Sequence, residues 1–249
     1  MGSFWSLYCT MHGANFATGG SSILPGGYSP FHLGLQISQF IQFKSHTKIL
    51  FYQNSVNNRT KLSFKSSIPR PNDFSRALYT FDIGQNDLAY GFQHMSEEQV
   101  RVSIPNILRQ FSLAVQQLYI EGARVFWIHN TGPIGCLPFN FLSYGSKQGN
   151  LDSSGCVKPQ NEIAQEFNRK LKDQISDYHG YQITCGKKSI GNETVNGNAC
   201  ENASKLVSWD GIHYSQAANS IIAKQIISGA FSDPPVAIDR VRYVNQGYI

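Results

Sequence analysis

Residues 77–87 read ALYTFDIGQND, and the rest of the chain is interpreted outward from this stretch. Its first part, residues 77–83, is a compact run of apolar, aromatic and β-branched side chains, which is typical of a β-strand. The four residues that follow, Gly84-Gln85-Asn86-Asp87, are of the types that dominate turns. The stretch therefore predicts a strand that ends in a tight turn.

The sequence after this turn continues with a helical pattern and then a second strand. Over residues 96–119 apolar side chains recur at helical spacing, and Gly122 is the expected end of this helix. We expect Pro105 within its first turns or at a break, because proline has no backbone N–H to donate. ARVFWIH, residues 123–129, predicts the next strand, and residues 130–138 are loop-like in composition.

The remaining segments extend the alternation of strands and helices. They are a short strand at 13–17, a helix over 30–43, an irregular segment over 53–76, an amphipathic helix over 160–174, loop-like sequence over 175–207 and a closing helix over 215–231. Strands that alternate with amphipathic helices predict an α/β fold with a parallel sheet covered on both faces. In such sheets the active site lies beyond the carboxyl ends of the strands, where glycine-containing loops follow all three expected strands here.

Composition limits the classes of protein that the chain can belong to. Its 249 residues are 41% hydrophobic and 15% charged, which allows a buried core and excludes a disordered chain. The net charge of +5 is mild and its basic residues are scattered, so nucleic-acid binding has little support. No apolar run approaches the roughly 18–20 residues that a membrane-spanning helix needs.

Cysteines and glycosylation sequons point to an oxidising compartment. The five cysteines are Cys9, Cys136, Cys156, Cys185 and Cys200, and the last four lie in loop-like sequence with no zinc-site spacing. Three Asn-x-Ser/Thr sequons begin at Asn58, Asn192 and Asn202. Both features favour a secreted protein, whereas residues 1–17 lack the pattern of a signal peptide.

Two residues in SWDGIHYS, residues 208–215, have the chemistry of a hydrolytic pair. His213 can accept a proton near neutral pH, and the Asp210 carboxylate, three residues earlier at a helix entry, can orient its ring. The alternative is that Asp210 only caps the following helix.

Two glycine-containing turns could supply hydrogen-bond donors to such a pair. Asn86 follows a strand and can direct its amide at a developing oxyanion, with Gly84 shaping the turn; the alternative is an ordinary turn. The backbone N–H of Gly20, or of Gly19 as an alternative, would be a second donor, unless residues 18–22 are only a flexible loop.

The order of these motifs resembles the plant branch of the GDSL esterase/lipase family, within the SGNH hydrolases. The matching stretches are HGANFATGGSSI (12–23), LYTFDIGQNDL (78–88), IHNTGPIGCLP (128–138), NEIAQEFNRKLKD (161–173) and SWDGIHYSQAAN (208–219). The resemblance covers residues 12–235 and implies a single domain with a three-layer α/β/α, flavodoxin-like parallel sheet. It also implies an ester hydrolase that needs no metal or organic cofactor and acts on an acyl ester of a lipid, a glycan or a small metabolite.

The resemblance assigns a role to each candidate residue. His213 would be the general base, Asp210 its orienting partner, and Gly20 and Asn86 the oxyanion donors, with Gly84 as the supporting turn. Two disulfides are expected, Cys136–Cys156 and Cys185–Cys200, which leaves Cys9 over; the alternative is that all five cysteines stay reduced. Asn58, Asn192 and Asn202 would be glycosylated in a secreted product, whereas a product without a signal peptide would stay in the cytoplasm.

The sequence departs from this family in two places. It contains no Gly-Asp-Ser nucleophile block, since Met1-Gly2-Ser3-Phe4 has no Asp and Ser21 and Ser22 belong to the second motif. We also expect that a strand and a helix of the family are missing near residues 174–175. We therefore expect a fragment, truncated at both places, with little or no activity. The alternatives are a non-catalytic remnant that binds an acyl or glycan ligand, and a chain that does not fold stably.

Overall fold

The computed structural model describes residues 13–56, 68–145, 149–175, 182–185 and 212–241. The elements are α1 (Leu33–Val56), α2 (Asp73–Arg76), β1 (Leu78–Phe81), α3 (Gln85–His94), α4 (Glu97–Ile120), β2 (Val125–His129), the 3-10 helix η2 (Ile134–Cys136), α5 (Pro138–Tyr144), α6 (Lys158–Ile175), β3 (Gln182–Cys185), α7 (Gln216–Ile227) and β4 (Ser232–Asp233). Among the described residues, no helix combines the length and apolar character needed to cross a bilayer.

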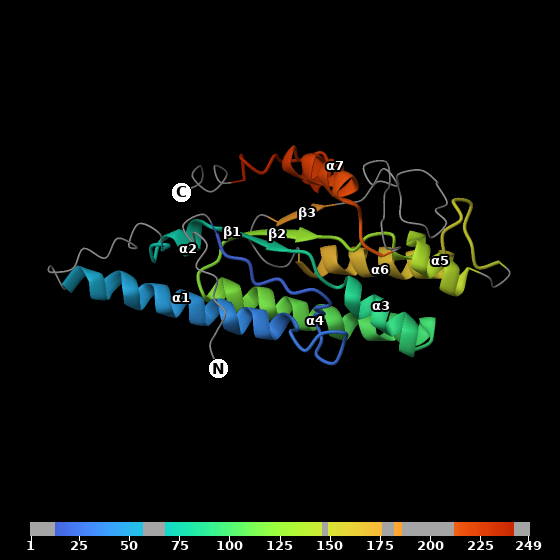
Figure 1. The fold of residues 1–249 in the computed structure, drawn as a ribbon, viewed down its shortest axis with the longest axis horizontal. Helices are drawn as coiled ribbons and strands as arrows, with labels where there is room; N and C mark the ends of the chain where they lie inside the picture. Colours follow the sequence, from blue (N-terminus) through green and yellow to red (C-terminus); the bar gives the residue numbers. More distant parts are fainter. Residues whose placement is uncertain (1–12, 57–67, 146–148, 176–181, 186–211, 242–249) are drawn as a thin grey trace.

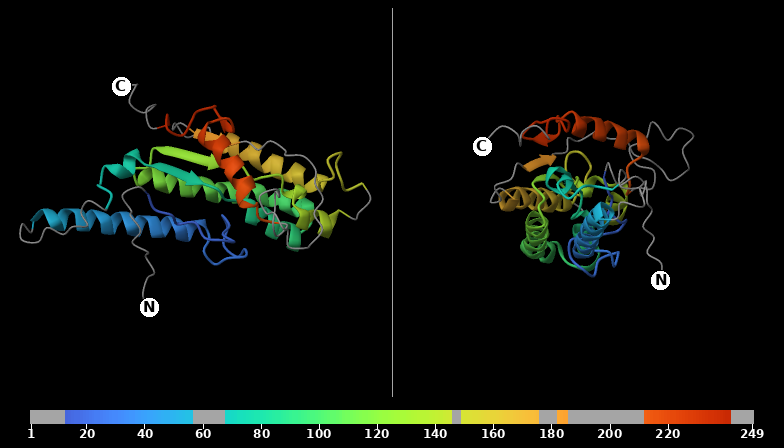
Figure 2. Two further views of the ribbon diagram at one scale, coloured as in Figure 1. Left: turned by 45° about the horizontal axis from the view of Figure 1, so that its top comes forward. Right: turned by 90° about the vertical axis from the view of Figure 1, so that its left-hand side faces the viewer.

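Four strands form one sheet in the order β1-β2-β3-β4. The first three are parallel, with Leu78 opposite Val125 and Phe126 opposite Gln182, and β4 is antiparallel to β3. Helices α1, α4 and α6 lie on one side of the sheet and α7 on the other (Figures 1 and 2). This arrangement confirms the expected α/β/α layering.

Alternate side chains of β2 pack against the helical layers on the two faces of the sheet. Phe126 and Ile128 pack into the main core beneath α4 and α6, whereas Val125 and Trp127 pack toward Ile226 of α7. All four side chains are at most 6% exposed. The continuous apolar character of this strand therefore follows from burial on both faces of the sheet.

Helix α4 shows local sequence signals acting as expected. Ser96 and Gln99 form a capping box, in which Ser96 Oγ accepts from Gln99 N (3.3 Å) and Gln99 Oε1 accepts from Ser96 N (2.9 Å). Gly122, with φ of 99°, lies just past the end of the helix. The helix begins at Glu97 and continues through Pro105 without interruption, so of the two placements expected for this proline, the break does not occur.

Several segment boundaries differ from those expected. Residues 13–17 are not a strand, because Phe16 packs against Phe40 and Phe43 of α1 instead of pairing in the sheet (ring centroids 6.0 and 5.9 Å). Helix α1 continues to Val56, well beyond the expected end at residue 43. The expected loop over 175–207 contains β3, whose backbone pairs in parallel with β2 although the sequence around it is loop-like in composition.

Candidate functional site

The turn after β1 depends on a glycine. Gly84 is buried, precedes the first residue of α3 and has φ of 105°, a conformation that L side chains rarely adopt. A Cβ atom at this position would lie 2.7 Å from Cζ of Phe167 on α6. The close approach of α6 therefore explains the glycine at this turn, beyond the general preference of turns for this residue.

Asn86 connects this turn to the segment that contains Gly20. Its Nδ2 atom donates to the carbonyl oxygen of Ser21 (2.8 Å), 65 residues earlier in the chain. A side-chain amide nitrogen carries two hydrogens, so this bond leaves a second one that can be directed elsewhere. The same residue can thus anchor the loop and donate to a bound group.

Asp87 makes the second connection, and its role was missed from the sequence. Its two carboxylate oxygens accept from the backbone N–H groups of Ile23 (2.8 Å) and Leu24 (2.9 Å). Burial raises the pKa of Asp87 from 3.8 to about 6, although these two hydrogen bonds act in the opposite direction. Its position beside Asn86 was visible in the sequence, but nothing there indicated the partner segment.

The segment held by these contacts contains Gly20 and two buried serines. Gly20 adopts φ of 75°, which favours glycine over any residue with a side chain. The hydroxyls of Ser21 and Ser22 donate to the carbonyl oxygens of Phe31 and Leu24. Both serines therefore have structural roles, consistent with their exclusion as the nucleophile.

One cavity of about 1640 Å³ brings most of the candidate residues together. Its wall includes Gly19, Gly20, Gly84, Asn86 and His213. The His213 side chain is exposed at this wall, three residues before Gln216, the first residue of α7.

Asp210 lies outside the described residues. The N-cap of α7 is Ser215, whose side chain accepts from Ala218 N (3.2 Å), so the interpretation of Asp210 as the helix cap is wrong. In the part of the chain that the structure describes, no group of three or more His, Cys, Asp or Glu side chains could hold a metal ion.

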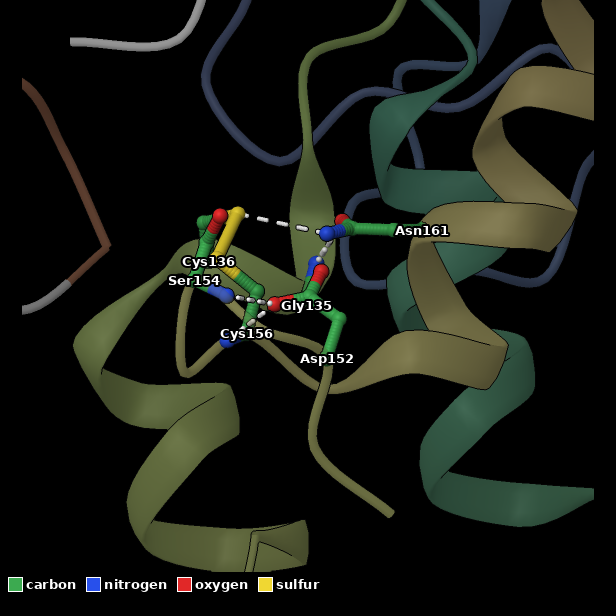
Figure 3. Close-up of a disulfide and its surroundings, with 6 residues drawn as sticks. All are labelled: Gly135, Cys136, Asp152, Ser154, Cys156 and Asn161. Carbon is green, nitrogen blue, oxygen red and sulfur yellow. Dashed lines mark hydrogen bonds between the residues drawn. A yellow bond between two sulfur atoms is a disulfide. The ribbon is translucent and has the colours of Figure 1, made fainter. Parts of the chain in front are cut away.

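The loop after β2 is held by a covalent bond (Figure 3). Cys136 and Cys156 form a disulfide, the pairing expected from the sequence. Gly135 N donates to Asn161 Oδ1 and Gly135 O accepts from Val157 N, both at 2.9 Å. A Cβ atom on Gly135 would lie 2.2 Å from the Val157 carbonyl oxygen, so only glycine fits there.

Asn168 of α6 attaches the first residues of this loop to the helix. Its amide oxygen accepts from Thr131 N and its amide nitrogen donates to Thr131 O, both at 2.9 Å, as a neighbouring strand would. The other proposed covalent features cannot be placed, since the Cys185 side chain, Cys200 and all three sequon asparagines lie outside the described side chains.

Comparison with known proteins identifies relatives along most of the chain. The family model described as GDSL-like lipase/acylhydrolase matches residues 3–226. A GDSL esterase/lipase of Arabidopsis thaliana is 42% identical over 284 residues, covering 93% of this chain and 72% of the relative. An esterase of Hevea brasiliensis is 38% identical (92% of this chain, 70% of the relative), and alpha-L-fucosidase 3 of Arabidopsis thaliana is 36% identical (88% and 72%).

Proposed function

This chain belongs to the GDSL-like lipase/acylhydrolase family, and from that premise we propose that its cavity is an ester-hydrolase site of the Ser-His-Asp type. In this mechanism a serine hydroxyl attacks the ester carbonyl, His213 takes the hydroxyl proton, and the proton then passes to the leaving alcohol. Asp210 would orient the His213 ring. Gly20 N–H and the second hydrogen of Asn86 Nδ2 would donate to the oxyanion.

The convergence of Gly20, Asn86 and His213 on one cavity carries this proposal. These residues are far apart in the sequence, and the Asn86–Ser21 hydrogen bond joins the two segments that would supply the oxyanion donors. Because the wall also contains many apolar side chains, the site suits an acyl ester, in keeping with the relatives named as esterases and lipases.

We further propose that residues 1–249 by themselves bind such a ligand without turning it over. No Gly-Asp-Ser occurs in the sequence, and the two serines at the cavity have their hydroxyls directed at backbone carbonyls. Removal of a triad nucleophile leaves only the small rate due to the oxyanion hole and binding. The alignment with the Arabidopsis thaliana relative spans 284 residues, more than the 249 of this chain, which supports the proposal that a segment of the family is missing from the interior of this sequence.

The second candidate function is binding of an acyl or glycan ligand without catalysis. The absent nucleophile block favours it, and one relative carries the name of a fucosidase, an enzyme class that acts on sugars. We also propose that the protein is a single-domain glycoprotein of a secretory compartment. The Cys136–Cys156 disulfide supports this location because such bonds persist in oxidising environments.

Labelling with a fluorophosphonate probe tests the hydrolase mechanism. The 249-residue protein, shown to be folded by circular dichroism, should remain unlabelled, while a fluorescent acyl ester should still bind in its cavity. The comparison is with His213→Ala and with His46→Ala, which replaces an exposed histidine on α1. Labelling of the parent chain that is lost in His213→Ala and kept in His46→Ala would contradict the proposal that the chain has no nucleophile, and would establish the hydrolase. Failure of the parent chain to bind any ester would contradict the ligand-binding role.

A further inference from the structure

The cavity extends along β1 and beyond both of its ends. Helix α2 directly precedes this strand and α3 directly follows it, so the two helices lie at opposite ends of β1 (Figure 1). Residues of both helices line the cavity, and the proposed oxyanion donors Gly20 and Asn86 lie on its wall near the junction of β1 with α3. The part around α1 and α2 is called the first arm below, and the part around α3 and α5 the second arm.

The first arm is lined by aromatic side chains in contact with one another. Phe16 packs edge-on against Phe40 and Phe43 of α1, and both of these rings contact Phe74 of α2. Phe40 also contacts Tyr79 of β1, whose hydroxyl donates to the carbonyl oxygen of Phe74 (2.8 Å). A wall of this kind suits a hydrocarbon chain, because apolar contacts need no particular direction.

Two tyrosines line the second arm. Tyr28 lies beside Gly20, since a Cβ atom on the glycine would be 3.5 Å from Cβ of Tyr28, and its ring packs edge-on against Tyr90 of α3. Tyr144 of α5 donates from its hydroxyl to the carbonyl oxygen of Phe92 (3.3 Å). Partial burial raises the pKa of Tyr28, and Tyr144 and Tyr90 raise it further, so its hydroxyl stays protonated at neutral pH. The Tyr28 side chain, 45% exposed, therefore offers both a ring face and a hydroxyl donor.

Amide side chains add neutral polar groups to the second arm. Gln93 and Asn140 line it, and Asn140 Nδ2 donates to Gln160 Oε1 (2.6 Å), which holds the buried Asn140 side chain in place. Among the described residues around α3 and α5 that line the cavity, none is Lys or Arg, the side chains that ordinarily bind a phosphate or carboxylate. The second arm therefore suits a neutral group that carries several hydroxyls.

The position of His213 indicates which part of an ester enters each arm. In the proposed mechanism the proton held by His213 passes to the leaving alcohol, so the alcohol must lie on the histidine side of the oxyanion donors. The described segment that leads into α7 approaches the sheet at the end where α3 and α5 lie, away from α2 (Figures 1 and 2). The alcohol would therefore enter the second arm and the acyl chain the first.

We propose, on the basis of the ester-hydrolase function proposed above, that the ligand is a fatty-acid ester of a sugar, with its acyl chain in the first arm and its sugar in the second. A sugar ring has apolar C–H faces that can stack on Tyr28 and hydroxyl groups that can bond to Gln93 and Asn140. The cavity volume of about 1640 Å³ exceeds the roughly 300–1,000 Å³ of most small-molecule pockets, as a ligand with two distinct parts requires.

Calorimetric titration with two esters that share an acyl chain tests this assignment. The 249-residue protein is titrated with glucose octanoate and with methyl octanoate. The sugar ester should bind about tenfold more tightly, as one or two net hydrogen bonds in the second arm would give. Equal affinities would overturn the sugar assignment and leave the cavity as an ester site. Failure of both esters to bind would contradict the proposed function itself, and the sugar assignment with it.

Two variants distinguish the arms. Tyr28→Ala should lower the affinity for glucose octanoate to that for methyl octanoate, which should itself be unchanged. Phe16→Ala should weaken both esters by the same several-fold factor, because it removes apolar contacts of the shared chain. Tyr52→Ala on α1, where the side chain is 52% exposed and does not line the cavity, is the matched control and should change neither affinity.

Two outcomes with these proteins would overturn the proposal. One is an equal loss of affinity for both esters in Tyr28→Ala, which would mean that Tyr28 contacts the acyl chain or supports the whole cavity. The other is tighter binding of phenyl octanoate than of glucose octanoate by the parent chain, which would identify an aromatic alcohol as the occupant of the second arm instead.

Discussion

The loops after β1 and β2 follow the carboxyl ends of two neighbouring parallel strands, yet they are held by different interactions. The first reaches α3 within three residues and is held by Asn86 and Asp87, which bond to a segment more than 60 residues away. The second continues for 28 residues to α6 and is closed by the Cys136–Cys156 disulfide and by asparagines of α6.

This difference predicts which solution condition affects the stability of each loop. The loop after β1 depends on a buried carboxyl group with a raised pKa, so its stability should depend on pH. The loop after β2 depends on a covalent bond and on neutral amides, so its stability should depend on redox conditions. Of the proposed oxyanion donors, Asn86 follows the pH-dependent loop directly, and Gly20 lies in the segment to which Asn86 and Asp87 are bonded.

The largest effect is expected from Gly135→Ala in the loop after β2. The new Cβ atom would lie 2.2 Å from a backbone oxygen, which cannot move without disturbing the start of α6. We expect the free energy of unfolding to fall by about 4 kcal/mol in urea denaturation. Gly19→Ala is the control, because a Cβ atom there meets nothing within 4 Å. An equal effect in both variants would contradict the packing argument.

Removal of the disulfide should have the next largest effect. The bonded cysteines are 20 residues apart, and closing a loop of this size stabilises a protein by about 3 kcal/mol. We expect the Cys136→Ser/Cys156→Ser variant to lose about this amount and to become insensitive to dithiothreitol at concentrations that destabilise the parent protein. Retention of the parent stability would mean that Asn161 and Asn168 alone hold this loop.

The pH dependence of stability should reveal Asp87. Its pKa rises from 3.8 to about 6 on folding, so the folded state binds more protons between these values. The stability contributed by the protonated group is therefore complete below about pH 4 and lost as the pH rises through 6, by at most about 3 kcal/mol. Asp87→Asn should lack this slope in urea denaturation at pH 3.5–7.5. Parallel pH profiles for the two proteins would contradict the assignment.

The smallest expected effect on stability concerns Asn86. Loss of its hydrogen bond to Ser21 O in Asn86→Ala should lower the free energy of unfolding by about 1 kcal/mol. Asn106→Ala on the exposed surface of α4 is the control. If Asn86 served only as a turn residue, both variants would behave alike; a loss well above that of the control supports its role as a connection between the two segments.

Sequence patterns predicted the elements whose signals are local. The strand 77–83, the helix after Ser96 and the strand 123–129 were located correctly because apolar periodicity, a capping residue and a terminal glycine are each encoded within a few positions. Residues 13–17 were misassigned as a strand, because their apolar residues pack on α1. The strand β3 was missed because its pairing with β2, more than 50 residues away, determines its conformation.

The sequence by itself determined the family, the alternation of strands and helices, and the types of residue that could form a site. Only the tertiary structure decided that Gly20, Asn86 and His213 share a cavity, that Asp87 connects two distant segments, and that β1 pairs with β2 in the described sheet. The physical reason is the range of the interactions. Periodicity and capping act over a few residues, whereas burial, the pKa of Asp87 and the pairing of sheet edges depend on neighbours that only folding brings together.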